Sequence, residues 1–443
     1  MGIQIRGSDD SISASPAGGV RIADLKLNSK TTAGRDAGIG TATATTIFNS
    51  TTKAFQIWTG SLWQNIFNQV DLDVIEGKIL VSTESTLTFR GDQFGSTGNN
   101  ITVNFSDGVS LNEDITGAIT TQDRVGVVTV TSAVYNNVTS GESISVKIIT
   151  SDGKESKIKS VRVVTPPVGG DTTTSYGNYV SHSFTSSGSF VVDPSYPVTV
   201  DYLIVAGGGG GGNANGGGGG GGAGGMRTGT VNLSGGTYPV QVGTGGAGVG
   251  ANTNAQGTPG NDSTFYFVTS TGGGGGGGEP PNSTQNGLPG GSGGGGGRAN
   301  GNGGSGTTGQ GNPGGTSVNN SGGGGGGASQ TGTNAQPEQG GAGGNGLNNA
   351  YANGSNVVYA GGGGGGCENG TPNTFGNGGN GGGGNGGAQN NSSSGPLVQA
   401  NDGTDGLGGG GGGGADTLSN VGTFKAGDGG DGIVVIRYNV HSS

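Results

Sequence analysis

The pattern of apolar and polar residues divides the chain into three regions, of which the first covers residues 1–80. At residues 46–63 two short apolar and aromatic stretches flank polar turn residues, which predicts a β-hairpin. We expect Trp58 and Trp63 to form a small hydrophobic cluster at a hairpin or trimer seam, with a ligand platform as the alternative. An isolated hairpin is only marginally stable, so this region is expected to pack against a neighbouring subunit or a larger structure. Residues 64–80 are expected to form a short helix or a connector.

Residues 81–165 are rich in β-branched residues, and apolar and polar positions alternate along several segments. Strands at this spacing, separated by turn residues, predict a small all-β sandwich of the immunoglobulin-like type. The Pro-Pro-Val-Gly-Gly sequence that follows predicts a linker at residues 166–174. The predicted strands are residues 85–89, 100–105, 126–134, 143–150 and 157–164.

Residues 175–443 begin and end with strongly apolar segments that flank repeated glycine runs. The opening segments are 179–184, 189–192 and 198–206, and the closing segment is 432–438. Because both flanks have the apolar character of strands, we expect them to pair and to close one domain. The glycine runs lie at residues 207–212, 216–222, 272–278, 293–297, 322–327, 361–366, 381–384 and 408–414.

Glycine supplies 113 of the 443 residues, a share that usually indicates a flexible, low-complexity chain. Ordering glycine costs more backbone entropy than ordering any other residue. Most of the runs, however, have five to seven residues. In polyproline-II geometry six residues span roughly 19 Å, so runs of equal length can pack as one layer whose backbones bond to each other. We therefore predict an all-β fold in which the glycine runs form a layered bundle of polyproline-II-type helices, which a side chain inside a run should disrupt.

Charge and hydropathy exclude several classes of partner. With 18 basic and 28 acidic residues the chain has a formal net charge of −10, whereas phosphate binding needs a basic patch, so we expect no nucleic-acid partner. No segment has the roughly twenty apolar residues of a membrane span, so we expect no membrane insertion. The first residues lack the apolar core of a secretion signal, which predicts that a standard signal does not export the chain.

Residue types that support catalysis are scarce. The one cysteine, Cys367, has no basic neighbour that would stabilise its thiolate. His182 and His441 are the only histidines, and neither lies in a metal-binding or nucleophile motif. We therefore predict no catalytic residue, no metal site and no cofactor, and we expect that the protein is not an enzyme.

Two pairs of aspartates are spaced three residues apart near the end of the chain, at positions 402 and 405 and at positions 428 and 431. Their carboxylates could supply oxygen ligands for calcium. The spacing matches neither an EF-hand loop nor the nonapeptide calcium repeat. Turn formation is therefore the favoured interpretation of both pairs.

The polar loops between the glycine runs are the expected binding surface, because function commonly lies in loops held by a rigid scaffold. They are rich in Asn, Ser, Thr and Gln, which suit hydroxyl-rich partners such as glycans. Tyrosine adds contact area with few rotatable bonds. Phe265 and Phe267 are assigned mainly to packing. The candidate binding residues are Tyr266, Tyr351, Tyr359 and Phe375.

Three stretches resemble known families. Residues 202–212, the glycine runs and residues 431–438 together resemble the glycine-rich domain at the ends of bacteriophage tail-fibre proteins and the tip adhesins of some T4-like phages. Residues 87–95 are similar to the opening of an IPT/TIG-type immunoglobulin-like domain. Residues 48–63 resemble a short hairpin module of phage structural proteins. The resemblance implies a sandwich of polyglycine-II helices whose connecting loops contact a host receptor.

The resemblance implies a virion structural protein, a tail fibre or adhesin, that binds a host cell-surface glycan or an outer-membrane receptor through the four aromatic residues. It also implies that residues 1–80 contact other virion proteins and that the chain forms a homotrimer. Two alternatives remain, a capsid-decorating fibre or head-surface protein and a disordered glycine-rich matrix protein. The expected domains are a virion-anchoring region (1–80), an Ig-like spacer (81–165), a linker (166–174) and a glycine-rich domain (175–443).

Overall fold

The computed structural model describes residues 70–251, 253–280, 285–368, 374–389, 398–416 and 425–440, together with the backbone of six strands within residues 1–69. The chain is almost entirely β, as predicted, and α2 (Ser132–Tyr135) is the only helix of this described part. Two compact units form. The first comprises residues 1–75, 87–129 and 144–160, and the second comprises residues 76–86, 130–143 and 161–443.

The hairpin predicted at residues 46–63 is present. Strands β4 (Thr46–Asn49) and β5 (Ala54–Trp58) pair in antiparallel fashion, and β6 (Trp63–Asn65) pairs with β5 so that Trp58 lies opposite Trp63. The side chains of both tryptophans, and with them the expected cluster, lie outside the described residues. The remaining strands here are β3 (Ser29–Lys30), parallel to β4, and the antiparallel pair β1 (Gly2–Ile5) and β2 (Ile12–Ser15).

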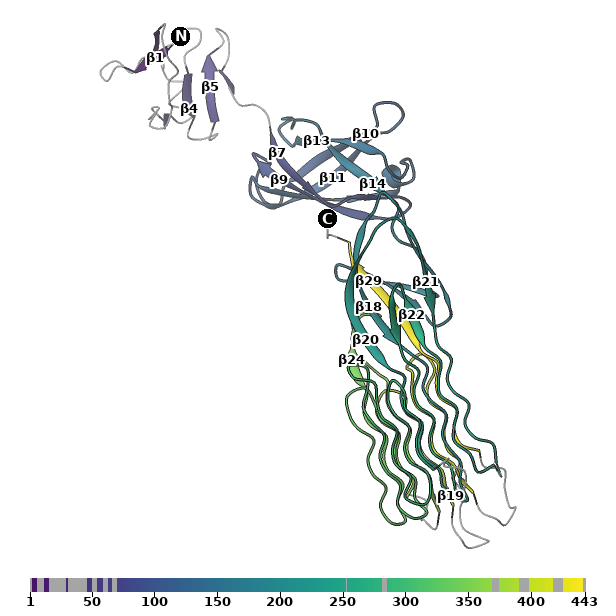
Figure 1. The fold of residues 1–443 in the computed structure, drawn as a ribbon. Helices are drawn as coiled ribbons and strands as arrows, with labels where there is room; N and C mark the ends of the chain where they lie inside the picture. Colours follow the sequence, from purple (N-terminus) through teal and green to yellow (C-terminus); the bar gives the residue numbers. More distant parts are fainter. Residues whose placement is uncertain are drawn as a thin grey trace. The chain divides into compact units, whose positions relative to one another are not determined.

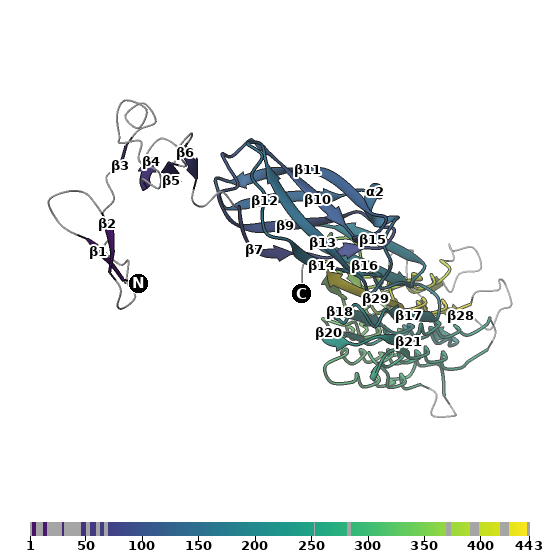
Figure 2. The same ribbon diagram turned by 90° about the horizontal axis from the view of Figure 1, so that it is seen from above.

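The first unit contains a sheet in which neighbouring strands follow the order β7-β9-β12-β11-β10-β13 (Figure 2). Alternate residues of each strand are buried, as in β10, where Ile101, Val103 and Phe105 point into the core. This alternation is the pattern that predicted strands in residues 81–165. The strands are β7 (Asp71–Glu76), β9 (Ser85–Asp92), β10 (Asn100–Ser106), β11 (Asn112–Thr121), β12 (Val125–Val130) and β13 (Ser143–Thr150).

Three details of this region differ from the prediction. The last residues of the segment predicted as a strand at 126–134 lie in α2, which begins at Ser132. The segment 64–80, expected as a helix or connector, contains β7 and β8 (Ile79–Leu80), because the alternation around the buried Leu72 is that of a strand. Strand β11 was not predicted at all. It begins with the polar sequence Asn-Glu-Asp and exposes most of its side chains, so its apolar signal is weak.

The second unit contains two antiparallel sheets. Five strands follow the order β15-β16-β29-β18-β20 and four follow the order β17-β21-β22-β23. Figure 1 shows β29, β18 and β20 side by side. Strands β18 (Val198–Val205) and β29 (Ile433–Asn439) pair directly, with Val205 opposite Ile433, which confirms the predicted closure. The other strands are β15 (Thr172–Tyr176), β16 (Tyr179–Phe184), β17 (Gly188–Val192), β20 (Met226–Leu233), β21 (Gly236–Gln241), β22 (Ser263–Phe265) and β23 (Val268–Ser270).

The central strands β18 and β29 are buried on both faces. One face contributes Ile204, Val434 and Ile436 to a core with Phe184, Phe190 and Phe265 from the surrounding strands. The opposite face contributes residues such as Leu203 and Val435 to a second core. Burial on both faces explains why these two segments are continuously apolar and do not alternate.

The segment expected as a linker, residues 166–174, is bonded into the second unit. Val168 exchanges two backbone hydrogen bonds with Val191, of 3.0 and 2.8 Å. The carboxylate of Asp171 accepts the N–H groups of Thr185 and Ser186 at 2.7 and 2.9 Å. In the same unit β14 (Lys159–Val164) pairs in parallel with β8.

Beyond the ends of β18, β20 and β29 the glycine runs lie side by side as traces without arrows (Figure 1). Only short strand pairs interrupt them. These are β19 (Gly216–Gly217) with β28 (Ala415–Asp416), β24 (Leu347–Asn349) with β25 (Val357–Tyr359), and β26 (Cys367–Glu368) with β27 (Ala388–Gln389).

Candidate functional site

The glycine run at residues 207–212 continues directly from β18 and bonds to six neighbouring segments. Backbone bonds of 2.8 to 3.1 Å join it to these neighbours, and none of the described bonds joins two residues of the run. Residues three apart reach the same neighbour, since Gly207 donates to Asn261 and Gly210 to Thr258. This repeat is expected of a helix with three residues per turn. The N–H groups reach segments 258–261, 427–430 and 219–222, and the C=O groups accept from 273–276, 246–249 and 411–414.

A second run, residues 218–223, has the same bonding. Its N–H groups donate to segments 411–414, 274–277 and 323–326, and its C=O groups accept from 363–366, 209–212 and 292–295. Both runs thus lie inside a lattice, and each of these two backbones has six bonded neighbours. We call this set of glycine runs the glycine lattice. Its order comes from backbone bonds, each of which contributes about 1 kcal/mol net.

Glycine is required inside the lattice because the backbones are too close for a side chain. A Cβ atom on Gly208 would lie 2.0 Å from the carbonyl oxygen of Gly409. On Gly211, one turn further, it would lie 2.0 Å from that of Gly412. At positions such as Gly208 and Gly211 the residue identity is therefore fixed by backbone packing, whereas Ala223, at the end of its run, carries a buried methyl group.

At the edge of the lattice, aspartates and asparagines accept the N–H groups that no neighbouring run reaches. Asp428 accepts from Gly248 at 2.7 Å, and Asp431, one turn later, accepts from Gly245 at 2.8 Å. Asp402 and Asp405 accept in the same way from the N–H groups of residues 428 and 431. The spacing of three therefore follows the helical repeat, and of the four aspartates Asp405 lies in a turn, at residues 405–408. No group of three or more potential metal ligands occurs among the described residues.

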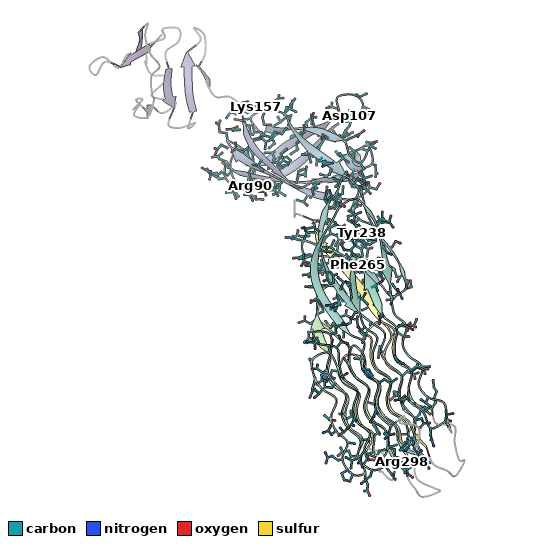
Figure 3. All side chains as sticks on the ribbon, viewed as in Figure 1. Arg90, Asp107, Lys157, Tyr238, Phe265 and Arg298 are labelled. Atoms are coloured by element: carbon teal, nitrogen blue, oxygen red, sulfur yellow. The ribbon has the colours of Figure 1, made fainter. Side chains whose placement is uncertain are left out.

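At the end of the lattice farthest from β18 and β29, Arg298 joins several loops (Figure 3). Its Nη1 lies 2.7 Å from Oε1 of Glu279 and also donates to the carbonyl oxygen of Asn215. Its Nε donates to Asn320, which in turn donates to Oε2 of Glu368 at 2.7 Å. Burial raises the pKa of Glu368, and the charge of Arg298 opposes that rise. Charged side chains thus fix the loop ends as the backbone fixes the runs.

Tyr351, a predicted binding residue, lies in the hairpin between β24 and β25 and packs against Arg437. The guanidinium carbon of Arg437 is 3.8 Å from the centroid of the Tyr351 ring and 4.2 Å from that of Tyr179. The hydroxyl of Tyr176 donates to the backbone oxygen of Tyr351 at 2.6 Å. Arg437 is also paired with Asp201 at 3.1 Å. Tyr351 is half-buried, so part of its ring is free for a partner while the rest holds the hairpin.

Tyr359 and Phe375 lie in different surroundings. Tyr359 is 2% exposed and belongs to the second core, which contains Leu203 of β18 and Val435 of β29. A ring with so little free surface cannot contact a receptor, so its assignment as a binding residue is corrected to packing. Phe375 is half-buried in a loop that follows β26, and no described interaction links it to the other candidates.

Tyr266 lies at the tip of the two-residue turn that joins β22 to β23 and is 48% exposed. Its ring centroid is 4.6 Å from that of Phe267 and 5.3 Å from that of Tyr238. The φ angle of Tyr266 is +56°, a left-handed conformation that costs about 1–3 kcal/mol for such a side chain. Phe265 is fully buried, as predicted, whereas Phe267 is 74% exposed, contrary to its assignment to packing.

The structure does not gather the four predicted residues into one site. It gives instead one small aromatic cluster, Tyr238, Tyr266 and Phe267, which we call the aromatic tip. The sequence prediction missed Tyr238 and Phe267. A signal was present, because two aromatic residues occupy a two-residue turn where glycine and asparagine are usual.

Of the groups considered for catalysis, Cys367 and His182 are buried, and His441 lies outside the described residues. Burial raises the pKa of the Cys367 thiol, which opposes thiolate formation. Burial lowers the pKa of His182, whose Nδ1 lies 2.8 Å from the carbonyl oxygen of Gly169. None of the helices in the described ranges is long and apolar enough to cross a membrane.

Comparison with known proteins identifies the C-terminal part of the chain. The model of a family described as "Glycine-rich domain" matches residues 185–439, which is more than half of the chain. No curated protein matches the sequence. The matched region contains the glycine lattice, the aromatic tip and the strands that close the domain.

Proposed function

The chain belongs to the glycine-rich domain family, and from this premise we propose that it is a bacteriophage virion protein, a tail fibre or tip adhesin that binds a host surface receptor. The resemblance of residues 202–212 and 431–438 to the ends of phage fibres supports the phage assignment. The IPT/TIG-like sequence at residues 87–95 supports a spacer role for the strands of the first unit.

The observation that carries the proposal is the six-neighbour bonding of the glycine lattice. It fixes glycine runs from which polar loops emerge, so these loops would be displayed on a rigid support. A partner that binds these loops would not have to order the chain first, which lowers the entropic cost of binding.

In this proposal the partner is a host glycan or an outer-membrane receptor, and the contact residues are Tyr266, Tyr351 and Phe375. Residues 1–80 attach the chain to other virion proteins, and the particle carries it as a homotrimer. The low number of basic residues makes an uncharged partner more favourable than an anionic one. From 191 to 432 there are eleven acidic residues and only three basic ones.

A capsid-decorating fibre would use the same parts at another place on the particle. Electron microscopy of purified particles labelled with an antibody against residues 175–443 separates the two locations. Label at the tail or fibre ends is the expected result, and label over the head would favour the decorating fibre. Absence of label from intact particles would refute the virion assignment.

The disordered matrix protein makes a different prediction. It predicts a C-terminal half that proteases degrade and that melts without cooperativity, whereas a bonded lattice predicts protease resistance and a sharp transition. Calorimetry of the full chain, with limited proteolysis beside it, distinguishes the two. A broad transition with rapid cleavage inside the glycine runs would favour the matrix protein.

A further inference from the structure

We propose that the aromatic tip, Tyr238, Tyr266 and Phe267, is a binding platform for the ring of a neutral saccharide. This inference rests on the proposed function for its biological setting and adds a ligand class and a location. The location is the edge of the four-stranded sheet, where the turn between β22 and β23 presents two exposed rings. It is separate from the loops at the far end of the glycine lattice.

The geometry of the turn indicates that its two aromatic rings serve ligand contact and not the stability of the hairpin. A two-residue hairpin turn is most stable with asparagine or glycine, whereas Tyr266 occupies its first position at a φ angle of +56°. Tyr238, which donates its hydroxyl to the carbonyl oxygen of Ser234 at 2.9 Å, packs edge-on against Tyr266. The rings are therefore held in place before any ligand arrives, although neither exposed ring contributes to the core.

The size of the platform argues for a small ligand. An aromatic side chain buries about 150–250 Å², so two rings that are 48% and 74% exposed offer at most about 300 Å². A stable protein interface needs roughly 800 Å² from each partner. The apolar surface is too small for a second copy of the chain but is large enough to cover one face of a sugar ring, since each of the two aromatic side chains itself presents a six-membered ring.

The surroundings of the platform argue for a neutral ligand. None of the residues in β17, β21, β22 and β23 is charged. On the outer face of the sheet Thr264 lies between Gln241 and Thr269 on the two neighbouring strands. Their amide and hydroxyl groups suit sugar hydroxyls. The nearby cation, Arg227, donates to the carbonyl oxygen of Thr269. A pyranose ring packs its C–H face on aromatic rings and directs its hydroxyls outward, which matches this arrangement.

Saturation-transfer NMR with the full chain tests the proposal. The probes are the methyl glycosides of glucose, galactose, mannose and N-acetylglucosamine, with glucose 6-phosphate and N-acetylneuraminic acid as charged comparisons. We expect transfer to the ring C–H protons of at least one neutral glycoside and weaker transfer to the charged sugars. Transfer to none of the neutral glycosides would overturn the proposal.

A matched pair of variants separates binding from folding. The double substitution Tyr266→Asn and Phe267→Gly removes both rings and installs the residue pair that two-residue hairpins favour, so the fold is retained. We expect it to weaken saccharide binding about tenfold or more, because the two rings supply most of the contact. The control Leu347→Ala shortens another exposed apolar side chain and should leave binding unchanged.

Three results of this comparison would contradict the proposal. Equal binding by the double variant would show that the sugar binds elsewhere, and equal losses in both variants would show a non-specific effect. A change in oligomeric state of the double variant in analytical ultracentrifugation would identify the tip as a contact between chains.

If the soluble chain blocks host adsorption but binds no saccharide, this inference fails and the proposed function stands. If it binds saccharide but particles carry no such chain, only the proposed function fails.

Discussion

At Gly221 a Cβ atom would lie 2.0 Å from the carbonyl oxygen of Gly209 and 2.7 Å from its carbonyl carbon. Backbone atoms cannot move aside as a flexible side chain can, so even the smallest side chain would displace a whole run. The same limit holds along the interior of the glycine lattice. Glycine there serves as the residue that lets backbones bond directly to each other, and its conformational freedom is secondary.

We predict that Gly221→Ala lowers the free energy of unfolding by about 3 kcal/mol, the upper range for overpacking a well-packed interior. The matched control is Gly250→Ala, because nothing lies within 4 Å of a Cβ atom at that position. It should stabilise the protein by about 0.4–1 kcal/mol by restricting the unfolded chain. Chemical denaturation of both variants measures the difference. Equal effects at the two positions would show that the lattice is not close-packed.

At the residue scale the sequence predicts which positions are interior, but not which partners they have. The glycine runs mark the interior because a Cβ atom on a glycine such as Gly208 or Gly221 would overlap a neighbouring backbone. Asp428 and Asp431 are three residues apart, which matches the repeat of the glycine helices. Before the structure is known, the same spacing fits a turn equally well. Tyr359 could not be assigned from sequence, because its burial depends on β18 and β29, which are more than seventy residues away on either side.

At the scale of elements, the hairpin of β24 and β25 is attached to the five-stranded sheet through Tyr351 and Arg437. We predict that Tyr351→Ala lowers the free energy of unfolding by about 1–2 kcal/mol, because the cation–π contact is partly desolvated. Tyr351→Phe keeps the ring and should have little effect. Thermal melting and hydrogen exchange of residues 347–359 measure the loss. A stable Tyr351→Ala variant with an unchanged hairpin would contradict this role.

His182 on β16 contacts the backbone of Gly169, and its burial predicts that the stability of the fold depends on pH. Burial lowers the pKa of His182 from its ordinary value of 6.5, and its Nε2 has no hydrogen-bond partner among the described residues. Because the folded state favours the neutral ring, the full stability is present above pH 6.5. As the pH falls below 6.5, the unfolded chain takes up a proton first, so stability falls until the folded pKa is passed.

Chemical denaturation between pH 7.5 and 5, on the order of one unit on either side of the ordinary histidine pKa, measures this effect. The wild-type chain should lose stability across this range. The variant His182→Phe retains a ring that can pack edge-on against Phe190 and stack on Tyr438 but cannot titrate. It should show a smaller slope. Identical slopes for the two proteins would place the pH dependence on other groups.

Elements with a strong local pattern were predicted well from the sequence, and elements defined by their neighbours were not. Segment 143–150 alternates apolar and polar residues, and segment 179–184 begins with Tyr-Val and ends with Phe. The structure has strands with those bounds. Strand β11 has a weak apolar pattern and is held by pairing with β10 and β12 on either side. The turn between β22 and β23 escaped prediction because its residues contradict the usual turn chemistry. Such contradictions are expected where function competes with stability.

At the scale of the whole molecule, the closing strands and the glycine lattice form one continuous structure. β18 runs directly into residues 207–212, and segment 426–432 runs directly into β29. The apolar cores therefore fix the first residues of the runs. The lattice extends that order by backbone bonds, and side chains such as Asp428 and Arg298 add bonds at its edge and far end. The central claim is that glycine runs ordered in this way act as a rigid scaffold.

Hydrogen exchange of the full chain, followed by mass spectrometry of peptides between Leu203 and Met226, tests this claim most directly. These peptides contain the two runs whose N–H groups are all bonded to neighbouring segments. We predict that their amides exchange as slowly as those of β18 and β29, since opening one run breaks bonds to six neighbours. Exchange at the rate of an unstructured peptide would contradict the ordered lattice.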